Sequence, residues 1–329
     1  MTRTFRRRTS LMLALATLLG LNAVAQAQGA SPNWPTKPIR ILVGFPGGST
    51  PDLVARAIAE PLSKALGQPV IVENKPGAGG NIAADAVAKA TDQHTIGVLI
   101  NGNMTIAKIL NSKVPYDPLK DLAPISLIAT APLVLTAPAN APGKTAAEWF
   151  DAARKAGNKL SYGSPGVGTV GHLGMELLKT KAGIDPVHVP YPGNPQVITA
   201  MIGGQIDLAL LPPGLAAPQI KAGKLRAIGV TSAGRSALAP DVPSLAEAGI
   251  KDYELEIWTA AAAPATLPKP IVAKLSSLIS EIVRSPEIRE RLQAQGWTVA
   301  GTSAEGLARR IKEDTRVLGG VIALRGINR

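Results

Sequence analysis

A glycine-containing turn at residues 45–52 is the first stretch whose residue types could do chemistry, because it joins an apolar strand pattern to a helical one. Its two glycines let the backbone turn sharply and leave N–H groups uncovered. Thr50 is predicted to cap the helix, with Pro51 at its first position and Asp52 in its first turn. A helix N-terminus offers unpaired N–H groups and the positive end of a dipole, so the turn could bind an anion. The candidate binding residues are Phe45, Pro46, Gly47, Gly48, Ser49, Thr50 and Asp52.

A second glycine-rich turn, residues 161–172, also follows a strand pattern and opens a helix. Its glycines Gly166, Gly168 and Gly171 have the G-x-G-x-x-G spacing of dinucleotide-binding loops. Such loops need an acidic residue after the next strand for the ribose, and residues 187–192 contain none, which argues against a dinucleotide. The backbone N–H groups still suit an anion, and Ser164 and Thr169 add hydroxyl donors. Two such turns, one from each half of the chain, would hold one small anion between them.

Each of these turns has alternative interpretations. An ordinary capped turn explains residues 45–52 equally well, and Asp52 could bind an amine or simply answer the helix dipole. Ser164 could be the nucleophile of a hydrolase with His172 or His188 as its base, but no carboxylate has an evident place beside either histidine. His172 either packs or caps at the helix start, or donates to a ligand.

A third turn, residues 73–81, again leads from a strand into a helix and contains Gly80 and Asn81. A flexible turn is its alternative interpretation. Both residues are kept as candidates for the ligand site.

The composition excludes several classes of function. There is no Cys, which rules out disulfides, cysteine-ligated zinc, iron–sulfur clusters and thiol catalysis. The 3 histidines lack metal-site spacing, so neither a metal nor another cofactor is expected. Aromatic residues make up 3%, too few to favour base stacking, and we expect no nucleic-acid partner.

Residues 1–27 have the pattern of an export signal. Four arginines precede an apolar run of 11 residues from Leu11 to Leu21, and Ala25-Gln26-Ala27 fits a cleavage site. Removal of these four arginines and no acids lowers the net charge from +12 to +8. The remaining basic residues are scattered, which indicates a general surface bias or weak steering of anions. The mature protein is therefore expected in the periplasm.

Strand-like runs alternate with helical patterns in two series, which predicts parallel sheets covered by helices. A Pro-rich stretch, residues 115–142, separates the series, and Trp258 in the last strand is expected in the core rather than in a cleft wall. Strands are expected at 39–43, 70–72, 95–100, 125–129, 133–136, 160–163, 187–191, 206–211, 225–231 and 255–263. Helices are expected at 51–66, 81–90, 145–156, 170–182, 197–202, 216–221, 271–283, 286–295 and 304–318, with capping boxes at 145–148 and 302–305.

The two series predict an α/β protein of two lobes, each a mostly parallel sheet flanked by helices. A β-type crossing near 125–136 and a return near 253–263 place a hinge between them. The first lobe is expected to comprise 28–132 and 253–329, and the second 133–252. Because open α/β sheets bind ligands outside the carboxyl ends of their strands, the ligand cleft should lie between the lobes.

Most of the chain after the signal resembles the substrate-binding proteins of tripartite tricarboxylate transporters, the Bug family. The matching stretches are WPTKPIRILVGFPGGSTPDLVAR, VIVENKPGAGGNIAADAVAKA, VPYDPLKDLAPISLIA, LSYGSPGVGTVGHLGMELLK, VHVPYPG, MIGGQIDLAL, IKAGKLRAIGVTSAGRS and PDVPSLAEAGI. The resemblance implies a two-lobed type II periplasmic-binding-protein fold without catalytic activity. It further implies a small carboxylate ligand, such as an organic acid, an acidic amino acid or an aromatic acid. The ligand carboxylate would be held by residues 46–52 and 164–169, partly through ordered water, with His172 and Tyr191 nearby.

The resemblance also implies partners, a large and a small integral membrane subunit, for a protein expected to be a monomer. Two loops depart from the family pattern: residues 101–105 lack its His/Asn-Pro, and Pro212-Pro213-Gly214 lacks its polar residue. Both are expected at the far end of the cleft, with Asn101 and Pro213 among the binding residues. That end should be less polar, which suits a ligand with one well-held carboxylate and a partly apolar remainder. The alternatives are presentation of the ligand to a sensor kinase, the hydrolase, and non-specific anion binding.

Overall fold

The computed structural model describes residues 33–236 and 240–327. The predicted export signal at residues 1–27 lies outside these ranges. Contacts divide the chain after Trp34, and Pro35–Arg329 forms one compact unit whose strands make two sheets. Among the helices in the described ranges, none has both the length and the apolar character needed to span a bilayer.

The first sheet has the strand order β11-β4-β10-β3-β1-β2. Strand β1 pairs in parallel with β2 and β3, and β10 pairs antiparallel with β3 and β4. Strands β1 to β4 therefore point one way, while β10 and the short β11 run against them. The bounds are β1 (Ile39–Val43), β2 (Val70–Asn74), β3 (Thr95–Ile100), β4 (Leu122–Pro132), β10 (Glu256–Pro264) and β11 (Thr298–Val299).

The second sheet has the order β7-β6-β8-β5-β9. Strand β6 pairs in parallel with β7 and β8, and β5 pairs antiparallel with β8 and β9, so β5 alone of these five strands is reversed. The predicted fold class is confirmed: two lobes, each a mostly parallel sheet flanked by helices. The bounds are β5 (Val134–Pro138), β6 (Ser161–Ser164), β7 (Val187–Pro190), β8 (Leu208–Leu211) and β9 (Leu225–Val230).

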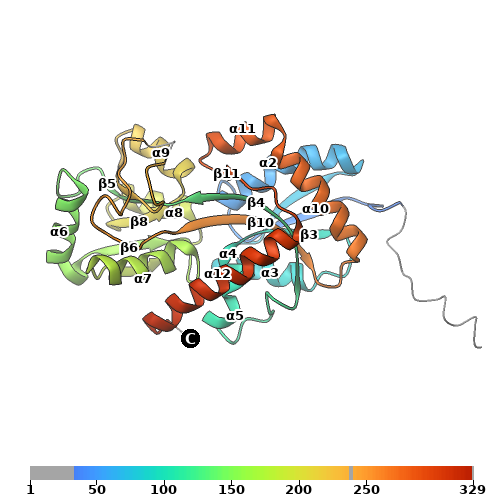
Figure 1. The fold of residues 1–329 in the computed structure, drawn as a ribbon, viewed down its shortest axis with the longest axis horizontal. Helices are drawn as coiled ribbons and strands as arrows, with labels where there is room; N and C mark the ends of the chain where they lie inside the picture. The colour runs from blue at the N-terminus through green and yellow to red at the C-terminus, as the bar shows by residue number, and fades with distance from the viewer. Residues whose placement is uncertain (1–32, 237–239, 328–329) are drawn as a thin grey trace, which may run out of the picture. The chain divides into compact units, whose positions relative to one another are not determined.

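The helices cover both faces of the first sheet, with α2 and α11 on one face and α3 and α12 on the other (Figure 1). The sequence analysis missed α4 and α5, because helices of five and four residues are too short to show an amphipathic period. The bounds are α2 (Thr50–Leu66), α3 (Asn81–Ala88), α4 (Asn101–Thr105), α5 (Ala107–Leu110), α6 (Ala146–Ala156), α7 (Val170–Ala182), α8 (Asn194–Ile202), α9 (Pro213–Lys221), α10 (Lys269–Arg284), α11 (Pro286–Ala294) and α12 (Ala304–Arg325), with 3₁₀ turns at Ala78–Gly80 and Gly157–Lys159.

Two predicted helix caps are shifted by one residue. Helix α2 is capped by Ser49 rather than Thr50, so that Pro51 is its second residue, where a missing N–H costs nothing. Helix α12 is capped by Ser303, whose hydroxyl accepts from the N–H of Gly306, rather than by Thr302. The hydroxyl of Thr302 instead accepts from the N–H of Leu127 in β4. The cap predicted at Thr145 is confirmed, because its hydroxyl accepts from the N–H of Glu148.

The chain passes between the sheets twice, at Leu133 between β4 and β5, and again between β9 and β10. Long strands β4 and β10 lie side by side at this passage (Figure 1). The buried hydroxyl of Thr231 accepts from the N–H of Leu133 at 2.8 Å and donates to the carbonyl of Leu255 at 2.6 Å. One side chain thus ties the two connections where the sequence places the hinge. The lobe boundaries themselves stay a prediction.

Trp258 lies in the core of the first lobe, as expected. Its side chain is fully buried, packs with Leu42, Leu99 and Ile311, and donates from Nε1 to Oδ2 of Asp314 at 2.5 Å. Neighbouring residues of a strand point to opposite faces, so Ile257 faces the other side of the sheet. That side carries the site described next.

Candidate ligand-binding site

Four helices begin around one small cavity. They are α2, α7, α8 and α9, whose N-cap residues Ser49, Thr169, Gly193 and Pro212 form no side-chain capping hydrogen bond. The first N–H groups of α2, α7 and α8, those of Thr50, Val170 and Asn194, therefore have no side-chain cap, whereas α9 begins with Pro213, which has no N–H. The positive ends of the four helix dipoles point toward the cavity. The cavity measures about 20 Å³ and is lined by Phe45, Ser49, Thr50, Pro51, Ile100, Leu133, Pro165, Thr169, Val170, Gly171, Asn194, Leu210, Pro212 and Ile257.

Three buried polar atoms on this cavity have no hydrogen-bond partner within the described residues. They are Oγ of Ser49, Oγ1 of Thr50 and Oδ1 of Asn194, on residues only 2%, 3% and 6% exposed. A buried polar group without a partner costs about 1–3 kcal/mol. No lining residue in this described set is charged. Unpartnered polar atoms and helix N-termini thus gather at a cavity without charged side chains in its lining, an arrangement that can accommodate an anion.

Asp52 does not line this cavity. Its carboxylate is instead hydrogen-bonded within the first lobe. Oδ2 accepts from the N–H of Gly48 at 2.9 Å, Oδ1 accepts from Nδ2 of Asn74 at 2.8 Å, and Arg56 Nε lies 3.0 Å from Oδ1. Nδ2 of Asn74 also donates to the carbonyl of Phe45 at 2.9 Å. Asp52 therefore fixes the turn that presents Ser49 and Thr50. The sequence left two interpretations of Asp52, a ligand for an amine or a partner of the helix dipole. The geometry fits the second, a structural role at the helix start.

The pKa of Asp52 makes this turn sensitive to acid. Burial alone would raise the pKa of its carboxyl, but hydrogen bonds from Arg56, Asn74 and the N–H of Gly48 outweigh burial, and the net pKa is lowered. A carboxyl with a lowered pKa stabilises the fold above its unfolded pKa of about 3.9, and this contribution is lost as the pH falls through the folded pKa.

We expect Asp52→Asn to lower the free energy of unfolding at pH 7 by about 1–3 kcal/mol, because three donors lose a charged acceptor. The difference from the wild type should stay constant down to about pH 5 and shrink below about pH 4. Urea denaturation across this pH range measures it. The exposed pair of Asp151 and Arg154 supplies the control, since Asp151→Asn should change stability by less than about 0.5 kcal/mol. A difference that grows in acid would contradict the role given to Asp52.

The turn at residues 164–169 is held by its own side chains. The buried hydroxyl of Ser164 accepts from the N–H of Gly166 and lies 3.2 Å from the carbonyl oxygen of Gly166. The same hydroxyl lies 2.7 Å from Nε2 of His188. The hydroxyl of Thr169 donates to the same carbonyl at 2.7 Å. These bonds shape the turn and aim the start of α7 at the cavity.

His172 lies in the first turn of α7 and does not line the cavity. Its Nδ1 accepts from the N–H of Gly168 at 3.3 Å, and its ring lies 4.3 Å from that of His188, which stacks on Tyr162. This geometry matches the packing and capping interpretation.

The third turn and the loop after β3 support each other. Nδ2 of Asn103 donates to the carbonyl of Gly79 and to Oδ1 of Asn81, both at 2.9 Å, and the hydroxyl of Tyr116 donates to that same Oδ1. Nδ2 of Asn101 donates to the carbonyl of Glu256 at 3.1 Å. Asn101 and Asn103, both in the loop 101–105 that is expected at the far end of the cleft, therefore hold backbone segments in place.

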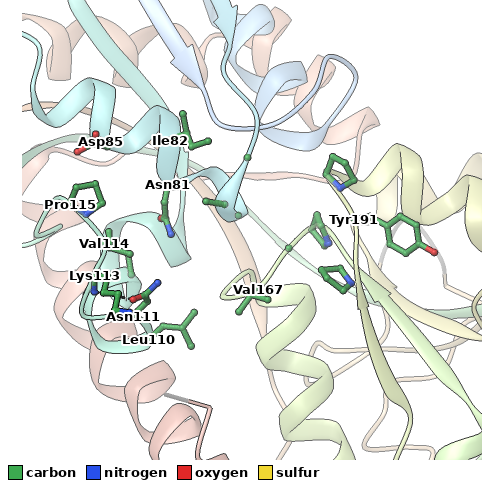
Figure 2. Close-up of a pocket in the computed structure, with 18 residues that line it drawn as sticks. Asn81, Ile82, Asp85, Leu110, Asn111, Lys113, Val114, Pro115, Val167 and Tyr191 are labelled. Carbon is green, nitrogen blue, oxygen red and sulfur yellow. Dashed lines mark hydrogen bonds between the residues drawn. The ribbon is translucent and has the colours of Figure 1, made fainter. Parts of the chain in front are cut away.

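A larger pocket of about 760 Å³ adjoins the small cavity at Pro165. Figure 2 shows Asn81 and Asp85 on one side of it and Val167 and Tyr191 on the other. A carboxylate here, Asp85, already pairs with Lys89. The small cavity, unlike the larger pocket, is lined by Ser49, Thr50 and Asn194, whose buried polar atoms have no partner within the described residues.

The structure brings together part of the predicted site. Phe45, Ser49, Thr50 and Thr169 line the small cavity. Asn81, Gly166 and Tyr191 line the larger pocket. The remaining candidates line neither: Pro46, Gly47, Gly48, Asp52, Gly80, Asn101, Ser164, Gly168, His172 and Pro213.

Asn194 was missed by the sequence analysis, which began the helix at Val197. The helix begins three residues earlier, with Pro195 among its first residues. Proline in the first turn marks a helix start, so Gly193-Asn194-Pro195 after a strand carried a usable signal. Among the described residues, no group of three or more His, Asp or Glu side chains could hold a metal ion.

Comparison with known proteins identifies the family to which the chain belongs. Residues 54–327 match the sequence family described as the tripartite tricarboxylate transporter family receptor, TctC. The periplasmic binding protein BugD is 31% identical, with a TM-score of 0.85, and the match covers 90% of this chain and 99% of BugD. MatC from Rhodopseudomonas palustris, solved with bound malate, is 32% identical with a TM-score of 0.83 over 88% of this chain and 100% of MatC.

Another R. palustris protein, solved with adipate, is 30% identical with a TM-score of 0.85, covering 89% of this chain and 98% of its own. The family is one of receptors rather than enzymes, which argues against the hydrolase interpretation of Ser164 and His188. The chain belongs to the tripartite tricarboxylate transporter receptor family, the group of solute-binding proteins that includes BugD.

Proposed function

We propose that this protein captures a small carboxylate in the cavity between its lobes. The observation that carries the proposal is the set of three buried, unpartnered polar atoms beside four helix N-termini, with no charged side chain lining the cavity. The ligand carboxylate accepts from helix N–H groups and from the hydroxyls of Ser49 and Thr50. The relatives solved with malate and adipate bind carboxylates, which supports this ligand class.

The rest of the ligand meets a largely apolar wall that includes Phe45, Ile100, Val170 and Ile257. This suits one firmly held carboxylate and a partly apolar remainder. A volume of about 20 Å³ has room for one or two water molecules, whereas pockets for small molecules usually measure about 300–1,000 Å³. The lobes therefore move apart to admit the ligand, with the connections at Leu133 and Thr231 as the hinge.

We further propose that the protein works in the periplasm as a monomer, after removal of residues 1–27. It would deliver its ligand to the large and small membrane subunits of a tripartite tricarboxylate-type transporter. The lobes are taken as residues 28–132 with 253–329, and 133–252. Membership of a transporter receptor family supports transport over presentation to a sensor kinase.

A thermal-shift screen against a panel of carboxylates, followed by calorimetry, tests the ligand class. A ligand at about 100 times its Kd stabilises the fold by about 2.7 kcal/mol, which raises Tm by a few degrees. We expect at least one acid to do so, and expect the shift to fall sharply in Ser49→Ala/Thr50→Val. Ser277→Ala, at an exposed serine of α10, is the matched control and should keep the shift. If no carboxylate binds by calorimetry, the proposal is wrong.

A further inference from the structure

Two histidine rings lie against each other beside the turn at residues 164–169. The ring centroids of His172 in α7 and His188 in β7 are 4.3 Å apart, and neither residue lines the small cavity. Each ring bonds a different part of the turn. Nδ1 of His172 accepts from the N–H of Gly168 at 3.3 Å, and Nε2 of His188 lies 2.7 Å from the hydroxyl of Ser164. Because an imidazole ordinarily gains its proton between about pH 5 and 8, the shape of this turn depends on which ring takes the proton.

A proton on His172 would break its bond to the turn. Nδ1 of this ring faces a backbone N–H, which can only donate, so the bond exists only while Nδ1 carries no proton. His172 is 5% exposed and lies in the first turn of α7, where burial and the positive end of the helix dipole both disfavour an imidazolium. The ring is therefore held in the neutral form with its proton on Nε2.

His188 can take up a proton while the turn keeps its shape. Its partner is a hydroxyl, which can donate to a neutral Nε2 or, after rotation, accept from a protonated one. In the second state Ser164 can donate to the carbonyl of Gly166, 3.2 Å away, while its oxygen still accepts from the N–H of Gly166. The half-buried ring of His188 also stacks on Tyr162, with 4.7 Å between centroids, and the face of an aromatic ring attracts a cation.

The charged groups around the pair do not reverse this order. Glu176, one turn further along α7, attracts a proton to either ring. Its carboxylate already accepts from the hydroxyl of Tyr162 at 2.7 Å and lies 3.4 Å from Nζ of Lys179. The other groups around α7 are Asp185, which pairs with Lys179 at 3.1 Å, the buried Tyr253, which donates to the carbonyl of Gly174, and apolar residues of β8 and α12 that include Leu210, Leu318 and Ile322.

We propose that His188 takes up the proton of this pair in a mildly acidic medium and so keeps His172 neutral, as the acceptor that shapes the turn. A proton on one ring repels a second proton from the other ring at this separation. His172 is then a positioning residue, and His188 protects it from protonation. The effect on ligand affinity rests on the proposed function, whereas the order of protonation does not.

NMR of the histidine ring nitrogens tests the order of protonation without a ligand. The chain has 3 histidines, so His94→Gln, His172→Gln and His188→Gln assign the signals. We expect His188 to titrate first, while His172 stays in the neutral form with its proton on Nε2. In His188→Gln, where no neighbouring charge forms, His172 should gain its proton about one pH unit higher than in the wild type. Earlier protonation of His172 in the wild type, or an unchanged titration of His172 in His188→Gln, would overturn the inference.

Calorimetry with an acid found in the screen gives the functional readout. The ratio of variant to wild-type Kd cancels the ionisation of the ligand. For His188→Gln we expect this ratio to rise about 5- to 100-fold between about pH 7.5 and pH 5, because protonation of His172 leaves the N–H of Gly168 without its acceptor.

His94→Gln is the matched control for the pH profile. His94 is also buried, at 6% exposed, but its Nε2 accepts from the N–H of Thr36 in the first lobe. Its Kd ratio should be constant over the same pH range. A ratio for His188→Gln that stays constant or falls in acid would overturn the inference that the position of the proton controls the turn. If no acid binds the wild type, the proposed function fails, and the NMR titration still decides the order of protonation.

Discussion

Gly102→Ala is expected to weaken ligand binding by about 5- to 150-fold without unfolding the protein. Gly102 lies in α4 of the first lobe, and a Cβ built on it would be only 2.4 Å from the carbonyl oxygen of Gly168 in the second. Because both contacting groups are backbone, we expect the lobes to relieve this contact by separating, and overpacking of this kind costs about 1–3 kcal/mol. Within its own lobe the alanine is harmless, because alanine favours a helix over glycine. Calorimetry with an acid found in the screen measures the change.

Gly320→Ala is the matched control for this prediction. Gly320 also lies in a helix, α12, but a Cβ at this position has nothing within 4 Å. It should bind ligand as the wild type does. Small-angle scattering gives an independent readout. At a ligand concentration that saturates the wild type, Gly102→Ala should have a larger radius of gyration than the wild type. Equal affinities of the two variants would show that closure does not bring Gly102 against Gly168 during binding.

Apolar packing supports the same contact between lobes. Ile106 and Leu110 of the first lobe share a buried cluster with Leu173 of α7 and with Leu318 and Ile322 of α12. Helix α12 thus packs against both lobes. We therefore expect apolar burial outside the ligand cavity to favour this arrangement of the lobes even without a ligand.

Most of the fold was predictable because its longer helices and strands have a local signal, which α4 and α5 lack. Apolar runs such as Ile39–Val43 are buried strands, and the helix predicted at 170–182 matches the bounds of α7. The turn at residues 45–52 was predictable as well, because two glycines before a Ser/Thr-Pro pair mark a strand-to-helix turn. Its capping residue was not, since Ser49 and Thr50 are chemically similar neighbours and only the backbone angles distinguish them.

The finer assignment of the site depends on contacts distant in sequence. Asp52 is of a residue type that could bind a ligand. Its carboxylate instead accepts hydrogen bonds from Arg56 and from Asn74, which is 22 positions away. Asn194 lines the cavity at the start of α8, where a Cβ built on the preceding Gly193 would lie 3.0 Å from Cδ of Pro46 in the first lobe. Periodicity and turn chemistry contain no information on such meetings, so a sequence can locate the turns of a cleft and still misplace the side chains that line it.

Trp258→Ala is expected to lower the free energy of unfolding by about 3–5 kcal/mol, the usual cost of removing a buried tryptophan. The side chain is 0% exposed and packs between the first sheet and α12, and its Nε1 donates to Asp314. Trp258→Phe should lose less, about 1–3 kcal/mol, because an aromatic ring remains while Oδ2 of Asp314 loses its donor. Urea denaturation measures both.

Val317→Ala in α12 is the matched control for this truncation, since Val317 is 45% exposed and should change stability by less than about 0.5 kcal/mol.

Ligand affinity supplies a second readout. Ile257, the neighbour of Trp258 on the opposite face of β10, lines the cavity, whereas Trp258 does not. Under conditions in which Trp258→Phe is fully folded, its Kd should therefore stay within about threefold of the wild type, because only residues on the Ile257 face meet the ligand. A loss of affinity without a loss of stability would place Trp258 in the cleft wall, and a cost below about 1 kcal/mol for Trp258→Ala would mean that α12 is held to the sheet by other contacts.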